Sequence, residues 1–200
     1  ATQAQGGVGL AVGLIMTLVW GLAQVRTAVS ALISKYLGMN KLDDIKSLIP
    51  QSLAFSLLLG GLFWFLTSFF YGDISRFLFQ EDNEQVKQFS ASYYNIRAMG
   101  LPLSLFIAGV FGIFRGYQNT SWAMVISLVG GATNIILDLI LVNGVKDTIP
   151  AYGVEGAAYA SVIAQLIMTL LCVVYLLKKT PFNLKLVLPL NHELSNMFWI

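Results

Sequence analysis

Residues 121–143 read SWAMVISLVGGATNIILDLILVN, an apolar run long enough to cross a bilayer as one helix. Asp138 is its only charged side chain, and no other charge occurs between Arg115 and Lys146. An ionisable group at membrane depth costs roughly 2.5–3.5 kcal/mol on insertion scales, so it is rarely kept without a use. Asn134 precedes Asp138 by one turn, which places both side chains on one helix face about 6 Å apart. This pair is the first candidate for a working site.

The Asn134–Asp138 pair allows two interpretations. In the first, Asp138 exchanges a proton or a cation, because an apolar surrounding disfavours the ionised form of a carboxyl group. A charged Asp138 would attract a cationic substrate or sodium, a protonated one would release it, and Asn134 would hydrogen-bond the carboxyl group in either state. In the second, Asp138 is satisfied structurally inside a helix bundle.

The whole chain shares this apolar character. Of its 200 residues, 56% are hydrophobic and 11% are charged, and the mean hydropathy is +0.72. Soluble domains carry about 25% charged residues, so the composition indicates an integral membrane protein. The alternating segments of about ten residues that mark an outer-membrane barrel do not occur, which predicts an all-α fold. Five apolar stretches have the length of a spanning helix: residues 7–34, 48–71, 89–114, 121–143 and 155–177.

Lys and Arg residues are unevenly distributed among the connecting loops. Those near residues 40, 116 and 182 hold Lys35, Lys41, Lys46, Arg115, Lys178, Lys179 and Lys185. The positive-inside rule therefore predicts that these loops face the cytoplasm and that the loops near 80 and 148 face outside. The first residues would then lie outside, which suggests a preceding span that this sequence does not contain.

Polar residues inside two other stretches extend the candidate site. Arg97 lies about two turns inside the third stretch, either as an interfacial anchor or as the counter-charge to an acid on a neighbouring helix. Pro102 follows it and is expected to kink that helix. Ser161 and Gln165 are one turn apart in the fifth stretch and are expected to face the same polar space. Small residues on that stretch should pack against the Asp138 helix: Gly156, Ala157, Ala160 and Ala164.

The chain offers little for catalysis or metal binding. Cys172 and His192 are the only residues of their types, and a lone cysteine in an apolar helix is typically a small buried hydrophobe. An intramembrane enzyme would need a paired acid, a Ser/His or Cys/His dyad, or a metal cluster. The sequence therefore predicts no enzyme, no metal site and no organic cofactor, and nucleic acid is not an expected partner.

Four stretches resemble, in chain order, the multidrug and toxic compound extrusion (MATE) family and its DinF-like branch. They are SALISKYLGMNKLDDIK (30–46), YNIRAMGLPLSLFIAGVFGIFRGYQNT (94–120), GGATNIILDLILVNG (130–144) and YGVEGAAYASVIAQ (152–165). The first is similar to the exit from the family's second helix, and the second to its fourth helix with the RG–x–Q–[DN]–T turn. The third is similar to the fifth helix with its Asn–x3–Asp pair, and the last to the opening of the sixth.

The resemblance implies a twelve-helix secondary transporter made of two six-helix lobes. Residues 1–180 would be helices two to six of the N-terminal lobe, and residues 181–200 the cytoplasmic inter-lobe linker with the start of the next helix. The resemblance assigns Asn134 and Asp138 to an ion-responsive site, and Ser161 stands where the family has threonine. The family's first helix, which supplies a further acid to that site, and helices seven to twelve are missing from this sequence, so both ends are interpreted as cut.

The predicted function is secondary active multidrug export in the cell inner membrane. The resemblance implies an antiporter whose organic, mostly cationic, substrates leave as protons or sodium ions enter. The bilayer and the rest of the same polypeptide are its expected partners. The predicted site comprises Asp138, Asn134, Ser161, Gln165 and Arg97. Two alternatives are a lipid-linked saccharide flippase of the same superfamily, which would need a cavity rich in basic residues, and a non-transporting membrane scaffold.

Overall fold

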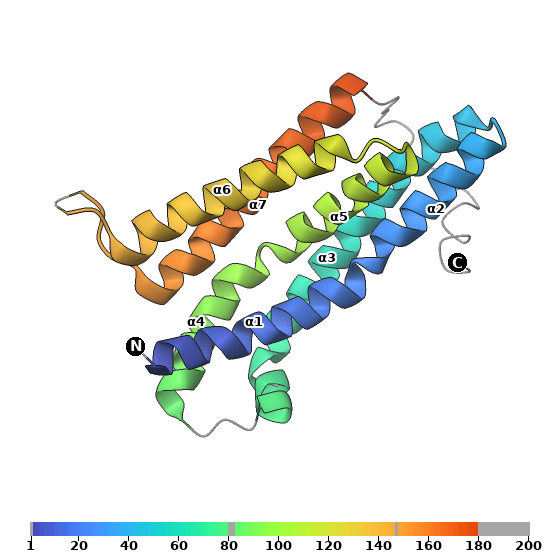
Figure 1. Ribbon diagram of the computed structural model, residues 1–200. Helices are drawn as coiled ribbons and strands as arrows, with labels where there is room; N and C mark the ends of the chain where they lie inside the picture. Colours follow the sequence, from blue (N-terminus) through green and yellow to red (C-terminus); the bar gives the residue numbers. More distant parts are fainter. Residues whose placement is uncertain (1, 80–82, 147, 180–200) are drawn as a thin grey trace.

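The computed structural model describes residues 2–79, 83–146 and 148–179, and these ranges are almost entirely helical (Figure 1). The prediction of an all-α fold is confirmed for this part of the chain. Residues 181–200, expected to form a linker, lie outside the described residues. The helices are α1 (Thr2–Leu22), α2 (Gln24–Gly38), α3 (Leu42–Phe79), α4 (Glu84–Ala98), α5 (Leu101–Gly116), α6 (Ser121–Asn143) and α7 (Gly153–Lys179).

These helices make up to five passes across a membrane. Only Ala23 separates α1 from α2, and the two together form one apolar span. The bent pair α4 and α5 is the third of the five passes, and α3, α6 and α7 each form one pass as a single helix. The unbroken spans that are long and apolar enough to cross a membrane are Gln5–Gly38, Leu42–Ser75, Ser121–Asn143 and Gly153–Lys178. Helices thus occupy all five of the stretches predicted to span.

The break between α4 and α5 follows from Pro102. Proline has no N–H group, so Pro102 cannot donate the helical hydrogen bond to the carbonyl group four residues back. Just before it, the Gly100 N–H bonds over 3.1 Å to the Arg97 carbonyl oxygen, a tighter turn of only three residues. The α5 pattern starts again when the Ser104 N–H bonds to the Gly100 carbonyl oxygen over 2.8 Å. The two halves meet at 48°, so the predicted kink is present.

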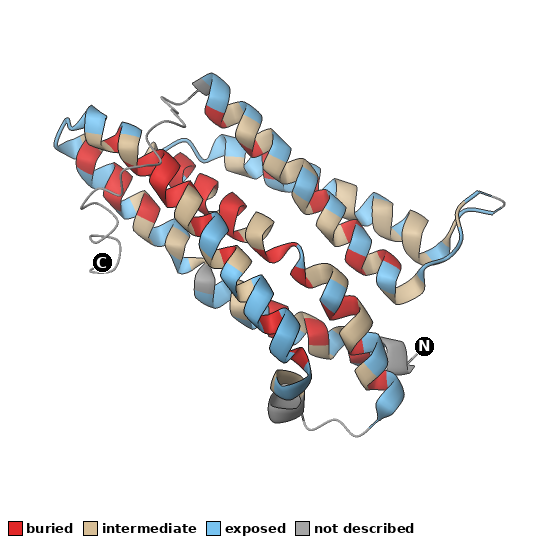
Figure 2. Ribbon diagram, turned by 180° about the vertical axis from the view of Figure 1, so that it is seen from behind, coloured by how far each residue is buried: buried red, intermediate tan, exposed pale blue. Residues whose placement is uncertain are grey.

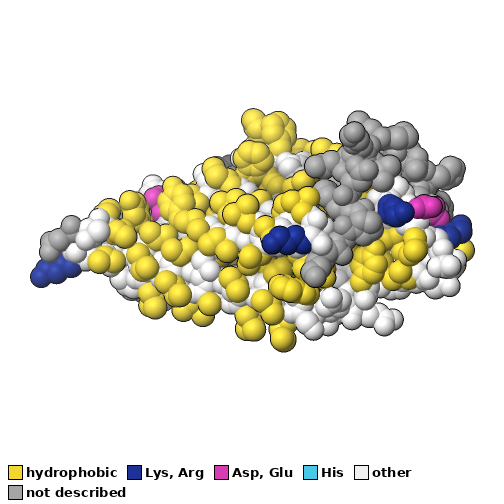
Figure 3. All heavy atoms as spheres, turned by 90° about the horizontal axis from the view of Figure 1, so that it is seen from above, with side chains coloured by type: hydrophobic (Ala, Val, Ile, Leu, Met, Phe, Trp, Pro, Cys, Tyr) yellow, Lys and Arg dark blue, Asp and Glu magenta, His cyan; other side chains and the backbone are white. Residues whose placement is uncertain are grey.

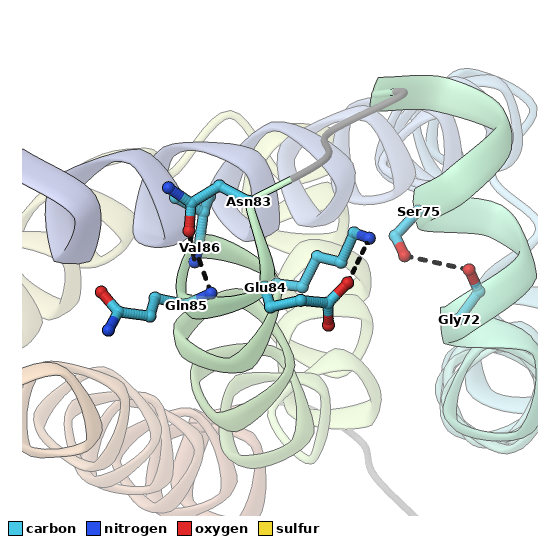
Figure 4. Close-up of polar contacts among 7 residues, drawn as sticks. Gly72, Ser75, Asn83, Glu84, Gln85 and Val86 are labelled. Carbon is cyan, nitrogen blue, oxygen red and sulfur yellow. Dashed lines mark hydrogen bonds and ion pairs between the residues drawn. The ribbon is translucent and has the colours of Figure 1, made fainter.

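Asn83 fixes where α4 begins. Its side-chain Oδ1 accepts hydrogen bonds from the backbone N–H groups of Gln85, at 3.0 Å, and Val86, at 3.3 Å (Figure 4). Such a cap satisfies donors that the first helical turn leaves without partners. Val86, Tyr93 and Arg97 follow at spacings that place them on one face of α4. The cap therefore sets the start of the helix that brings Tyr93 and Arg97 to the interior.

Helix α5 is the centre of the packing. It lies against α2 and α3, while α4 lies against α1 and α7, and α6 pairs mainly with α7. A Cβ atom at Gly112 would be 2.7 Å from the Arg26 carbonyl oxygen, and one at Gly116 would be 2.7 Å from Ile33 Cβ. The two glycines thus let α2 approach α5 closely. Figure 2 shows that buried residues concentrate in this region and are sparse in the α6–α7 hairpin.

Much of the outer surface is apolar. Figure 3 shows hydrophobic side chains over most of one face. On α6 the large apolar residues Leu128, Ile135 and Leu139 are each more than 60% exposed, as is Phe69 of α3. A soluble protein rarely exposes this much apolar surface. The apolar outer surface is suited to contact with lipid or with further transmembrane helices.

Candidate functional site: a polar cluster among four helices

Close packing between α6 and α7 brings the polar faces of these two helices together. A Cβ atom at Gly156 of α7 would lie 2.5 Å from the Leu141 carbonyl oxygen of α6, so only glycine allows this approach. The prediction that the small-residue stripe packs against the Asp138 helix is thus confirmed at Gly156. Further along α7, Ser161 and Gln165 are both half-buried. The first of them faces α6, and the second faces α4 and α5.

Asn134 and Ser161 join α6 to α7. The Asn134 Nδ2 donates a hydrogen bond to Ser161 Oγ over 3.3 Å. The two residues were singled out separately in the sequence, one by its spacing to an acid and the other by its place in a motif. The structure brings them together.

Gln165 joins α7 to both halves of the broken span. Its Oε1 accepts a hydrogen bond from Arg97 Nη1 of α4 at 3.1 Å, and its Nε2 donates one to Ser104 Oγ of α5 at 2.7 Å. The amide group of glutamine accepts through one atom and donates through the other, which suits a position between a guanidinium and a hydroxyl group. Gln165 and Ser161 therefore contact different neighbours, although both line the inner side of α7.

Asp138 faces the protein on the same side of α6 as Asn134. Both are half-buried, whereas Ile135, Ile136 and Leu139 between and beside them are exposed. This is the shared face that the one-turn spacing predicts. Asp138 Oδ1 is fully buried and has no hydrogen-bond partner among the described residues. A buried oxygen without a partner is costly, so a hydrogen-bond donor or a cation bound at this oxygen would be stabilising.

Tyr93 of α4 also belongs to the cluster, although the sequence alone does not indicate it. Its side chain is buried, at 6% exposed, and interacts with Arg97, with Ser161 and with the charge of Asp138. A tyrosine in an apolar stretch beside a second tyrosine is typical of helix packing and gives no sign of function. The feature of the sequence that points to Tyr93 is its one-turn spacing to Arg97, which places both side chains on one face of the helix.

Ser104 of α5 also belongs to the cluster, through its bond to Gln165. It lies two turns beyond Arg97 along the chain, a spacing that would place both on one face if the helix were unbroken. The intervening proline obscured that relation, because the direction of a kink cannot be read from its position.

Arg97 points inward to α7. The sequence left open whether it is an interfacial anchor or the counter-charge to an acid on a neighbouring helix. It does reach a neighbouring helix, but its partner there is the neutral Gln165. In the described part of the chain the ion pairs are Lys41–Asp44, Lys46–Asp43 and Lys87–Glu84, all at exposed positions. None of them involves Arg97 or Asp138.

The described residues contain no group of three or more His, Cys, Asp or Glu side chains that could hold a metal ion. What they contain is a cluster in which Asp138, Arg97 and several neutral polar groups are turned inward from spans whose outer faces are apolar. Ionisable residues turned to the interior of a helix bundle are the usual mark of a functional pathway in a membrane protein. Fold and site together define a multi-pass helical membrane protein with a polar site among its helices.

Comparison with known proteins identifies the family. The MatE family profile matches residues 2–140, and the chain belongs to that family. Protein DETOXIFICATION 43 of Arabidopsis thaliana is 39% identical over 87 residues, which are 44% of this chain and 16% of that protein. The probable multidrug resistance protein YoeA of Bacillus subtilis is 29% identical over 150 residues, which are 75% of this chain and 32% of that protein. The chain therefore spans a third or less of these relatives.

Solved structures share the fold. One is the outward-facing conformation of a multidrug resistance MATE family transporter of the MOP superfamily, with a TM-score of 0.86 and 22% identity. The match covers 97% of this chain and 42% of that one. The inward-facing conformation of such a transporter matches with a TM-score of 0.87 and 22% identity, over 99% of this chain and 44% of the other.

Proposed function

We propose that this chain forms part of the N-terminal lobe of a secondary active multidrug exporter in the DinF-like branch of the family. The proposal rests on one observation above all. Inside a membrane span, the Asp138 carboxyl group has a buried oxygen that finds no hydrogen-bond partner among the described residues, near the Asn134–Ser161 pair and Tyr93. The names of the relatives, which include multidrug resistance proteins, support export of small organic molecules. An assembly of two bundles around a central site would complete the alternating-access machine.

In this proposal, ion and substrate compete for one carboxylate. When Asp138 is charged, it attracts a cationic substrate or a sodium ion, because an unpaired negative charge in a medium of low dielectric constant binds cations strongly. When it is protonated or ion-bound, that attraction disappears and the substrate leaves. Asn134, Ser161 and Tyr93 carry neutral groups that can donate or accept hydrogen bonds, so they tolerate either state of the acid.

The coupling ion in this scheme is a proton or sodium, and the setting is the cell inner membrane. In this scheme Arg97 is held by the neutral Gln165 of α7 and is not paired with Asp138. The same engagement gives no support to a flippase, whose pyrophosphate substrate would need free basic groups.

The test is ion-driven efflux by the full-length protein in liposomes. Wild type and Asp138→Asn are compared under an imposed pH gradient and then under an imposed sodium gradient, with an organic cation as the transported probe. We expect Asp138→Asn to lose efflux under whichever gradient drives the wild type. Asp43→Asn, the same chemical change at an exposed position that is ion-paired with Lys46, serves as the control and should keep efflux. Unchanged efflux in Asp138→Asn would show that the carboxylate is structural.

A further inference from the structure

The break between α4 and α5, in the third pass, lies directly against α7. Helices α4 and α5 meet at 48°, and both pack on α7. A break without support from outside would leave the two halves free to change their angle, since the proline removes one of the hydrogen bonds that stiffen a helix. The angle must therefore be set by contacts across the break.

Gln165 makes contacts on both sides of it. Arg97, one residue from the end of α4, donates to Gln165 Oε1, and Ser104, in the first turn of α5, accepts from Gln165 Nε2. The two bonds measure 3.1 Å and 2.7 Å. One side chain thus links the helix before the proline to the helix after it.

Gly100 leaves the space that this linkage needs. A Cβ atom at Gly100 would overlap Gln165 Oε1 and would lie 2.8 Å from Arg97 Nη1. The amide group of Gln165 therefore sits against the backbone at the break itself. Because two bonds and a close backbone contact converge there, the position of Gln165 and the angle of the span constrain each other.

The angle of α4 also decides where Tyr93 lies. Tyr93 is one turn before Arg97 on the same helix face and interacts with Ser161 and with the charge of Asp138. If Arg97 were released, α4 could rotate or straighten about the break and carry Tyr93 away from α6 and α7. Holding Arg97 thus keeps the tyrosine at the polar cluster.

We propose that Gln165 is a positioning residue that fixes the angle between α4 and α5 and thereby holds Tyr93 beside Ser161 in the polar cluster. This role differs from direct binding of ion or substrate, because both functional atoms of the Gln165 side chain are engaged by protein partners. It goes beyond the proposed export function, and it can be tested without transport.

The angle can be measured by electron paramagnetic resonance in the full-length protein. Spin labels at Gln88 of α4 and Arg115 of α5, both exposed, report across the break in a Cys172→Ala background. At 1.5 Å per residue the two positions are about 40 Å apart along the helices, and straightening the bend lengthens their separation by about 3–4 Å. We expect a single narrow distribution of distances between the two labels in the otherwise unsubstituted protein.

Four substitutions then separate positioning from general loosening. Gln165→Leu removes both bonds and should lengthen and broaden the distance, and Ser104→Ala removes one and should broaden it less. Gln165→Glu should keep the narrow distance, since a carboxylate accepts from Arg97 and from the Ser104 hydroxyl group. Thr169→Val, one turn away, loses only a bond to the Gln165 backbone and should also keep it.

The inference is overturned if the distance between the two labels in Gln165→Leu is the same as in the wild type. It is also overturned if Gln165→Glu or Thr169→Val broadens the distance distribution as much as Gln165→Leu does. The export proposal fails on a different result, namely ion-driven efflux that survives in Asp138→Asn. Each proposal can therefore fall while the other stands.

Discussion

Asn134 on α6 donates a hydrogen bond to Ser161 on α7, over 3.3 Å between Asn134 Nδ2 and Ser161 Oγ. This bond lies one turn from Asp138 on the same face of α6. The residue that the sequence pairs with the acid is thus also the residue that ties the acid's helix to its neighbour. A change at either partner is expected to affect both stability and the site.

The strength of the Asn134–Ser161 bond can be measured by a double-mutant cycle. Asn134→Ala and Ser161→Ala each remove one partner, and the double variant removes both. We expect a coupling free energy of about 0.5–1.5 kcal/mol, the usual net value of one hydrogen bond. The measurement is reversible unfolding of the full-length protein in mixed micelles. Strictly additive effects of the two substitutions would mean that the bond contributes nothing to stability.

A side chain at Gly100 should displace the amide group of Gln165. In Gly100→Ala the new methyl group overlaps Gln165 Oε1, so we expect destabilisation of about 1–3 kcal/mol, as for other overpacked positions. Gly131→Ala is the matched control, because a Cβ atom there meets nothing within 4 Å. In the α6 helix that change should be neutral or stabilising by roughly 0.5–1 kcal/mol. In detergent, the unfolding temperature of Gly100→Ala should therefore fall, whereas that of Gly131→Ala should stay the same or rise.

Shortening the side chain of Met168 on α7 should compensate for a larger side chain at Gly130 on α6. A Cβ atom at Gly130 of α6 would overlap the side chain of Met168 on α7. We expect Gly130→Ala to lower the unfolding temperature and a second substitution, Met168→Ala, to recover part of the loss by opening space. A double variant less stable than the sum of the single effects would contradict this packing of α6 on α7.

The predicted sidedness of the loops can be tested by cysteine labelling. Single cysteines at Lys41 and Gln118 should react only with a reagent that crosses the membrane, and cysteines at Asn83 and Lys146 should react with an impermeant one. The physical basis is the excess of Lys and Arg in the first pair of loops. The experiment requires the full-length protein in intact cells and a Cys172→Ala background. The reverse pattern would invert the predicted orientation.

Pro102 should be the cause of the break between α4 and α5, whose angle Gln165 is proposed to fix. Pro102→Ala restores an N–H group to the chain, so the hydrogen bonding of α4 can continue into α5. We expect the helix to straighten and the distance between labels at Gln88 and Arg115 to lengthen by about 3–4 Å, from a rise of 1.5 Å per residue. An unchanged distance would mean that the tertiary contacts alone impose the bend.

The sequence predicted the elements of the site better than their contacts. Asn134 and Asp138 could be placed on one inward face because a helix repeats every 3.6 residues and the rest of that stretch is apolar. Tyr93 and Ser104 could not be found in this way. Their roles depend on how α4 and α5 are rotated against α7, and a tyrosine or a serine in a span carries no mark of its partner.

Arg97 likewise could be identified from the sequence, but its partner could not. Its charge within an apolar stretch was visible, and so was the need for an inward partner. That the partner is Gln165, and not an acid, depends on the 48° break that turns the end of α4 toward α7.

The sequence by itself determined the helices, the membrane environment and the family, because these follow from the lengths of apolar runs and from local motifs. It also determined the position of the kink, because proline acts on its own backbone. The tertiary structure alone decided which polar groups meet. Those contacts depend on the relative rotation and closeness of helices, and these in turn are set by glycines such as Gly100 and Gly156, whose neighbours become apparent only once the helices are packed.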